Sequence, residues 1–107
     1  MSLYLKLDPR LESSSFFITN LALSQVRLSY NAAFPWVLLI PARESVTEII
    51  DLTPEDQQIL IQEISHASNV MRGLFQPDKL NVASLGNVVP QLHVHIIARY
   101  KADKAWP

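Results

Sequence analysis

The stretch QLHVHIIAR, residues 91–99, carries the clearest structural pattern in the sequence. Apolar and polar side chains alternate at its start, with Leu92, Val94 and Ile96 set against Gln91, His93 and His95. Because successive side chains of a strand point to opposite faces, we predict a strand over residues 91–100 that buries the apolar set. Same-face neighbours lie about 6.5–7 Å apart, so the two imidazoles and the amide form one polar row. A row on a rigid element suits ligand binding or catalysis.

Three upstream segments predict further strands. Residues 16–19 are a short apolar run, and residues 36–40 form a continuous apolar run that stops at Pro41. Residues 25–30 alternate between apolar and polar side chains, which is typical of a half-buried strand with Arg27 on its polar face.

The remaining short segments are less regular. We predict a strand over residues 79–85 with Leu80 and Val82 pointing inward, and a short strand or extended link over residues 48–52. Residues 3–11 are expected to form an irregular arm with a turn at Asp8-Pro9.

One long helix interrupts the strands. Thr53 is a suitable capping residue, Pro54 suits the first helical position, and two acidic residues follow. Apolar residues then recur at spacings of four and three: Leu60, Ile64, Ala67, Met71 and Leu74. We therefore predict about 20 helical residues ending near Gly73 or Gln76-Pro77. The order of elements indicates an α+β fold, a mostly antiparallel sheet of about five strands with one long helix.

Composition limits the class of protein. The chain has 107 residues, of which 49% are apolar, so we expect one domain over residues 1–107. The formal charge of −1 argues against binding of long nucleic acid by bulk charge, and the lack of cysteine excludes thiolate chemistry. The first residues show no signal-peptide pattern, and no apolar run is long enough for a membrane span. We expect a soluble, cytoplasmic protein.

The residues of the polar row leave three chemical interpretations open. The histidines can be solvated or hydrogen-bonded side chains of a half-exposed strand. His-x-His on a strand can also supply two nitrogen ligands to a metal, although further ligands are scarce. The third interpretation is a histidine nucleophile or acid–base pair. His66, on the polar side of the predicted helix, is expected to be a solvated surface residue.

The segment VPQLHVHII, residues 89–97, resembles the signature of the histidine triad (HIT) nucleotide hydrolases and transferases, in which three histidines alternate with apolar residues. The resemblance extends to Gly86 and Asn87 before the motif, to residues 80–84, to Asn31, and to the strand and helix start of residues 36–41 and 50–55. The segment LDPRL, residues 7–11, with the final AWP, resembles a bacterial branch of small HIT proteins.

The resemblance implies a HIT-like fold and a role for each matching residue. His93 takes the middle place, whose imidazole attacks the α-phosphorus of a nucleotide to give a nucleotidyl-histidine. His95 takes the third place, where a donor steadies phosphate oxygens. Gly86 and Asn87 are expected near the phosphate or leaving group, and Asn31 near the ribose. Turn roles remain alternatives for both asparagines.

Three positions depart from the family pattern. Gln91 replaces the first histidine, Val88 replaces a common hydroxyl residue, and Trp36 stands where another histidine is common. An amide cannot carry a proton between groups, so we expect Gln91 to support binding rather than proton transfer.

The resemblance implies a hydrolase or transferase acting on nucleoside phosphoramidates or dinucleoside polyphosphates. We expect no structural metal and no cofactor beyond a magnesium ion carried by a polyphosphate substrate. A homodimer is also expected. The alternatives are a non-catalytic nucleotide-binding module and a metal-binding interaction protein.

Overall fold

The computed structural model describes residues 5–107 and shows one antiparallel sheet between helices. Its elements, in chain order, are α1 (Pro9–Ser14), β1 (Ser15–Asn20), β2 (Ser24–Ser29), β3 (Trp36–Pro41), a 3-10 turn (Ile49–Asp51), α2 (Pro54–Phe75), β4 (Lys79–Ala83) and β5 (Val94–Arg99). The strands follow the order β1-β2-β3-β5-β4, and every neighbouring pair is antiparallel. The predicted α+β class and five-stranded sheet with one long helix are confirmed.

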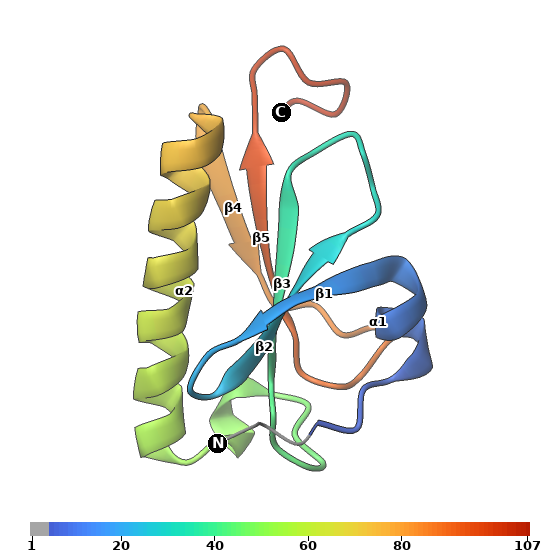
Figure 1. Cartoon of the computed structure of the whole chain (residues 1–107), viewed down its shortest axis with the longest axis vertical. Coiled ribbons are helices and arrows are strands. Elements are labelled where there is room, and N and C mark those ends of the chain that lie inside the picture. The colour runs from blue at the N-terminus through green and yellow to red at the C-terminus, as the bar shows by residue number, and fades with distance from the viewer. Residues whose placement is uncertain (1–4) are drawn as a thin grey trace.

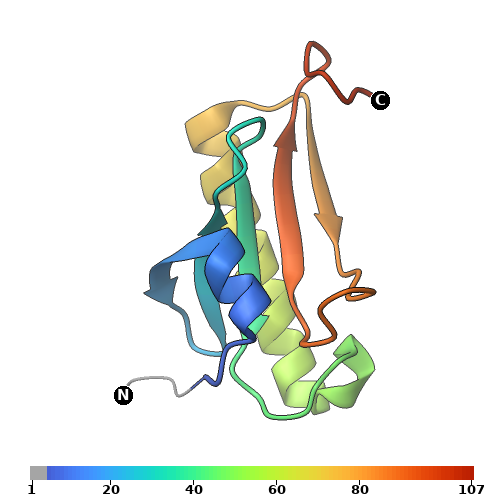
Figure 2. The ribbon, with the colours of Figure 1, turned by 90° about the vertical axis from the view of Figure 1, so that its right-hand side faces the viewer.

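The sheet separates two apolar layers. In Figure 1, α2 lies on the left of the sheet and α1 on the right, and Figure 2 shows α1 in front of the strands with α2 behind them. The larger core lies under α2 and includes Leu39, Leu60 and Ile96. A smaller core on the other face joins Leu11 of α1 to Leu38. Both faces of the central strands are therefore covered.

Helix α2 forms as its sequence predicts. The Thr53 hydroxyl accepts a hydrogen bond from the Asp56 amide at 3.1 Å, and Pro54 occupies the first turn. The helix ends where Gln76 adopts a left-handed backbone with φ of 48°. Leu60 and Met71 are buried as expected, but Leu74 is exposed. The prediction for Leu74 was wrong because the last turns of α2 border an open apolar groove against β1 and β2.

Two predictions failed because α1 was not anticipated. Residues 9–11 of the expected irregular arm belong to α1, since the Asp8 carboxylate caps the Arg10 amide at 2.8 Å and Pro9 opens the first turn. Leu3 and Tyr4 of the expected arm lie outside the described residues. Arg27 is buried because α1 covers that face, and its guanidinium donates to the Ser15 hydroxyl at 2.7 Å.

Other boundaries also differ from the sequence prediction. Residues 49–51 form a 3-10 turn rather than a short strand or an extended link, and β5 begins at Val94, three residues later than predicted. Val82 is exposed rather than inward, because β4 is an edge strand with a neighbour on one side only.

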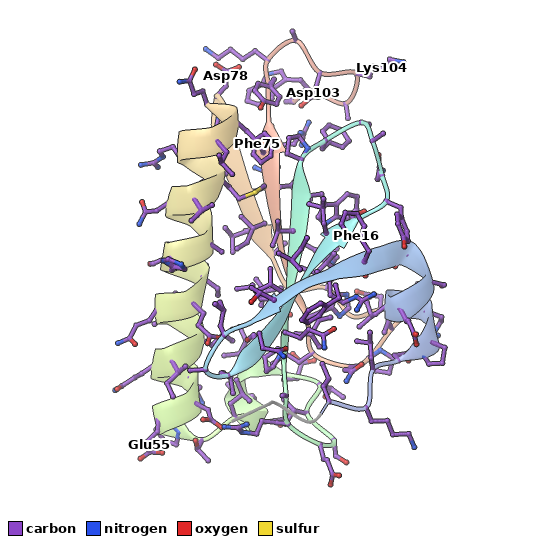
Figure 3. The ribbon with its side chains drawn as sticks, viewed as in Figure 1. Phe16, Glu55, Phe75, Asp78, Asp103 and Lys104 are labelled. Atoms are coloured by element: carbon purple, nitrogen blue, oxygen red, sulfur yellow. The ribbon has the colours of Figure 1, made fainter. Side chains whose placement is uncertain are left out.

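The segment after β5 is held to the ends of β5 and α2. The Arg99 guanidinium donates to both Asp103 carboxylate oxygens, at 2.8 and 3.0 Å, and holds the pKa of Asp103 below its usual range. The Tyr100 hydroxyl donates to the Phe75 carbonyl at 2.6 Å. Figure 3 shows Phe75 and Asp103 at the same end of the molecule, opposite Glu55.

Over residues 5–107, none of the helices combines the length and apolar character needed to cross a bilayer.

A buried carboxyl group joins α2 to the turn between β1 and β2. Glu63 accepts a hydrogen bond from the Leu23 amide at 2.8 Å through Oε2. We predict that Glu63→Ala lowers the free energy of unfolding by about 1–3 kcal/mol, because the buried Leu23 amide loses its partner. Glu63→Gln keeps an oxygen acceptor and is expected to lose less.

Urea unfolding of the three proteins measures this difference. Gln62→Ala, at an exposed neighbour on the same helix, is the control. Equal losses for Glu63→Gln and Glu63→Ala would contradict the assigned role of the acceptor.

Candidate active site

His93 lies directly before β5, and only 6% of its surface is exposed. Its Nδ1 is 2.6 Å from the backbone carbonyl oxygen of Gln91. A carbonyl only accepts hydrogen bonds, so this contact requires a proton on Nδ1. In the neutral ring, Nε2 then carries the free lone pair, which is the form that a nucleophile needs.

His95 stands one same-face step further along, inside β5. The two imidazole rings have centroids 4.8 Å apart and meet nearly edge to face, at 77°. The indole Nε1 of Trp36 donates to Nδ1 of His95 at 2.9 Å. Burial, with a smaller contribution from His93, lowers the pKa of His95. The two histidines of the motif are therefore adjacent, and His95 is favoured in its neutral form.

Gln91 contacts the N-terminal arm, which we define as residues 5–8. Its Oε1 accepts from the Asp8 amide at 2.8 Å, and its Nε2 donates to the Lys6 carbonyl at 3.1 Å. The prediction that Gln91 and His93 lie on the last strand was wrong, because β5 begins only at Val94. The side chain of Gln91 thus holds the arm, and its backbone carbonyl contacts the His93 ring.

The loop over residues 86–90 precedes the histidines. Gly86 has φ of +78°, a backbone conformation that favours glycine, and Asn87 and Val88 are exposed. The Arg10 guanidinium donates to the Val88 carbonyl at 2.9 Å and to the Asp8 carboxylate. The hydrogen bonds from Arg10 lower the pKa of Asp8, and His93 contributes a smaller lowering effect. The arm and this loop are therefore tied together beside His93.

Asn31 lies in the connection between β2 and β3. Its Oδ1 accepts from the Ala33 amide at 2.9 Å, which forms a local turn, and the residue is exposed. The turn role foreseen for Asn31 is thus present. Asn31 precedes Trp36 by five residues in the chain, on the segment that leads into β3.

Sequence reasoning missed three contributors to this site. Trp36 was noted as a departure from the family pattern, but its contact with His95 was not foreseen. Asp8 and Arg10 were placed in an irregular arm, whereas the structure puts them against Gln91 and the loop before it. The capping pattern of Asp8-Pro9, which matches that of Thr53-Pro54, was the available signal.

Two further features lie apart from the histidine pair. His66 is exposed on α2, as expected. A cavity of about 540 Å³ lies between the arm and residues 42–47, bordered by Gln91 but by neither His93 nor His95.

In the described chain, no group of three or more His, Asp or Glu side chains is arranged around a metal position. The expected absence of a structural metal stays a prediction.

Comparison with known proteins agrees with this arrangement. The sequence profile of the HIT domain matches residues 10–102. Solved structures with the same fold include a histidine triad protein from Bradyrhizobium japonicum, with a TM-score of 0.95 and 48% identity over 96% of this chain and 77% of that one. Another from Marinobacter aquaeolei has a TM-score of 0.94 and 44% identity over 96% and 75% of the two chains. The chain belongs to the HIT domain family.

Two curated relatives are more distant. A bis(5'-adenosyl)-triphosphatase from Saccharomyces cerevisiae is 34% identical over 72 residues, or 63% of this chain and 35% of the yeast protein. The asymmetrical bis(5'-nucleosyl)-tetraphosphatase of Schizosaccharomyces pombe is 30% identical over 96 residues, or 85% and 52% of the two chains. This chain thus spans between one third and about half of their lengths.

The two hydrogen bonds of the Gln91 side chain predict that this residue stabilises the arm. In Gln91→Ala, we expect faster hydrogen exchange at the Asp8 amide, because that amide loses its acceptor. The free energy of unfolding is expected to fall by about 1–3 kcal/mol. Amide exchange followed by NMR, with urea unfolding, measures both effects. Gln58→Ala, at an exposed position on α2, is the matched control, and unchanged exchange at Asp8 would show that Gln91 does not hold the arm.

Proposed function

We propose that this protein hydrolyses or transfers nucleotidyl groups of nucleoside phosphoramidates or dinucleoside polyphosphates, with His93 as nucleophile. The observation that carries the proposal is the 2.6 Å contact between His93 Nδ1 and the Gln91 carbonyl. That contact leaves Nε2 with its lone pair, beside a second imidazole. Membership of the HIT family and the names of the two curated relatives support the substrate class.

The proposed reaction has two displacements at the α-phosphorus. In the first, His93 Nε2 forms a bond to phosphorus while the P–O or P–N bond breaks, and the leaving group keeps the electron pair and takes a proton from solvent where it departs as an amine. In the second, water or another acceptor attacks the same phosphorus and gives up its proton to solvent, and the P–N bond to His93 breaks so that Nε2 regains its lone pair. Both steps depend on positioning and on donors to the phosphate oxygens.

The other residues of the site have supporting roles in this proposal. His95 donates to a phosphate oxygen, while Gly86 and Asn87 shape the loop beside the leaving group. Asn31 contacts the ribose from the β2–β3 connection. Gln91 acts through its carbonyl, which sets the orientation of the His93 ring. Its side-chain amide serves the arm, because Asp8 and Lys6 already engage its two ends.

That engagement of Gln91 also favours a second candidate function. A site whose first family histidine is replaced by an amide committed to the arm suits a nucleotide-binding module without turnover. Binding without formation of a covalent adduct would distinguish this candidate from the enzyme.

We predict that His93 carries a covalent nucleotidyl group during turnover. Incubation with an adenosine phosphoramidate or a diadenosine polyphosphate, followed by acid-free intact-mass analysis, is expected to show one adenylyl group per chain. His93→Ala is expected to lack both the adduct and turnover, because no other ring presents this unprotonated Nε2.

His66→Ala serves as the control, since His66 is exposed on α2. It should form the adduct as the wild type does. Circular dichroism of His93→Ala is the check that the variant is folded. An adduct of equal yield on His93→Ala would remove His93 from its assigned role, and nucleotide binding without any adduct in the wild type would favour the binding module.

We further propose a homodimer formed through the edge strand β4. In the described chain, β4 pairs with β5 alone, so one side of its backbone is open, and Val82 and Leu85 are exposed beside it. An open edge with apolar side chains is a template for pairing with a second chain.

Sedimentation at micromolar concentration is expected to report about twice the 12.1 kDa chain mass. Val82→Glu is predicted to shift the protein toward monomer, because it places a charge in the apolar contact. Val70→Glu, at an exposed valine on α2, is the control and should remain dimeric. A monomeric wild type throughout the concentration series would reject the dimer.

A further inference from the structure

Trp36 makes a directed contact with the second histidine of the site. It is the first residue of β3 and pairs with Ile97 of β5, while Leu38 pairs with His95. Trp36 and Leu38 lie on the same face of β3, so Trp36 is two residues from the position directly opposite His95 and on the same face of the sheet as His95. The indole and imidazole centroids are 5.4 Å apart, and Nε1 of Trp36 is 2.9 Å from Nδ1 of His95. This is hydrogen-bond geometry between two rings held on paired strands.

The chemistry of an indole allows only one direction for this bond. Tryptophan has one N–H donor and no nitrogen acceptor, so Nδ1 of His95 must supply the lone pair. A proton on Nδ1 would place two hydrogens between atoms 2.9 Å apart and break the bond. The neutral ring that satisfies Trp36 carries its single proton on Nε2.

We propose that Trp36 is a positioning residue that fixes His95 as the neutral tautomer with its proton on Nε2. His95 is thereby a permanent hydrogen-bond donor toward the substrate and does not take up a second proton during the reaction. The assignment of the phosphate oxygen as its acceptor rests on the proposed function. The tautomer itself depends only on the contact with Trp36.

The partners of the two histidines give the rings opposite chemistry. The Gln91 carbonyl accepts a hydrogen bond from Nδ1–H of His93, which leaves the lone pair on Nε2. The Trp36 N–H donates a hydrogen bond to the Nδ1 lone pair of His95, which leaves the proton on Nε2. A nucleophile and a donor therefore lie side by side, which is the pair that displacement at phosphorus requires.

The charges around His95 agree with a neutral ring. His93 is the titratable group in ring contact, and Asp8 of the arm interacts electrostatically with His93 rather than forming a pair with His95. Arg27 lies on the same face, paired with Leu38 of the intervening strand. Among residues 5–107, no carboxylate forms an ion pair with His95. An imidazolium at this position would lack a counter-charge, so protonation of the neutral His95 ring is disfavoured.

Long-range ¹H–¹⁵N NMR of the full chain tests the tautomer directly. In the wild type at pH 7.5, we expect a protonated Nε2 and an unprotonated Nδ1 for His95. Trp36→Phe keeps an aromatic ring but removes the donor. It is expected to change the ratio of the two neutral tautomers about five- to tenfold toward Nδ1–H, the scale of one lost hydrogen bond. The titration midpoint of His95 should rise toward the ordinary value of 6.5.

Trp106→Phe is the matched control, because Trp106 stacks near Arg99 rather than on His95. It should leave both the tautomer and the titration midpoint of His95 unchanged. A proton on Nδ1 of His95 in the wild type would overturn the inference, and that result needs no variant to fold. Unchanged tautomer and midpoint in folded Trp36→Phe would overturn it as well.

The pH dependence of turnover separates this inference from the proposed function. If the protein is the proposed enzyme, Trp36→Phe should lower kcat and move its acidic limb toward higher pH, while KM changes less. If the wild type forms no adduct, the reaction assigned to His93 is wrong, whereas the NMR result still decides the role of Trp36.

Discussion

The pairing of β5 on both of its edges is the constraint on which the candidate site depends. β5 pairs with β3 on one side and with β4 on the other, and its alternate residues Val94, Ile96 and Ala98 are buried under α2. A shift of one residue in either pairing would turn this apolar set away from the core. The register is therefore strongly specified, and it places His95 on the opposite face with the Trp36 indole within reach. The packing that stabilises the fold therefore also orients the His95 side chain.

Backbone and side-chain partners then distinguish two chemically identical rings. His93 precedes β5, outside the regular strand. Its Nδ1 contacts the backbone carbonyl of Gln91, two residues earlier in the chain. His95 lies within β5, where its backbone pairs with the neighbouring strands, and its Nδ1 contacts the Trp36 side chain of β3. The start of β5 between the two histidines therefore separates their surroundings: Nδ1 of His93 meets a backbone acceptor, and Nδ1 of His95 meets a side-chain donor.

The residues of the sheet and of α2 were predictable because their patterns are local. Alternation over residues 25–30 and 91–99, and the Thr53-Pro54 start of α2, define elements without knowledge of what they contact. The failures at Arg27, Val82 and Leu74 share another cause. Whether a side chain on a regular element is covered depends on which other segment lies over it. Arg27 is covered by α1, while the edge position of β4 and the groove beside α2 leave the others open.

Among the site residues, the motif indicated His93 and His95 but could not show what Gln91 does. Substitution of an amide for the first family histidine looks like a loss of chemistry when only the motif is considered. In the folded chain the amide has two partners in the arm, the backbone N–H of Asp8 and the backbone C=O of Lys6. The arm in turn carries Asp8, which caps α1 and pairs with Arg10 at the loop before the histidines. Gln91 therefore couples the N-terminal segment to the orientation of His93, because its side chain and its carbonyl belong to the same residue. A substitution at this position keeps the backbone carbonyl that His93 contacts but removes the side chain that holds the arm, so the identity of residue 91 matters first for the arm.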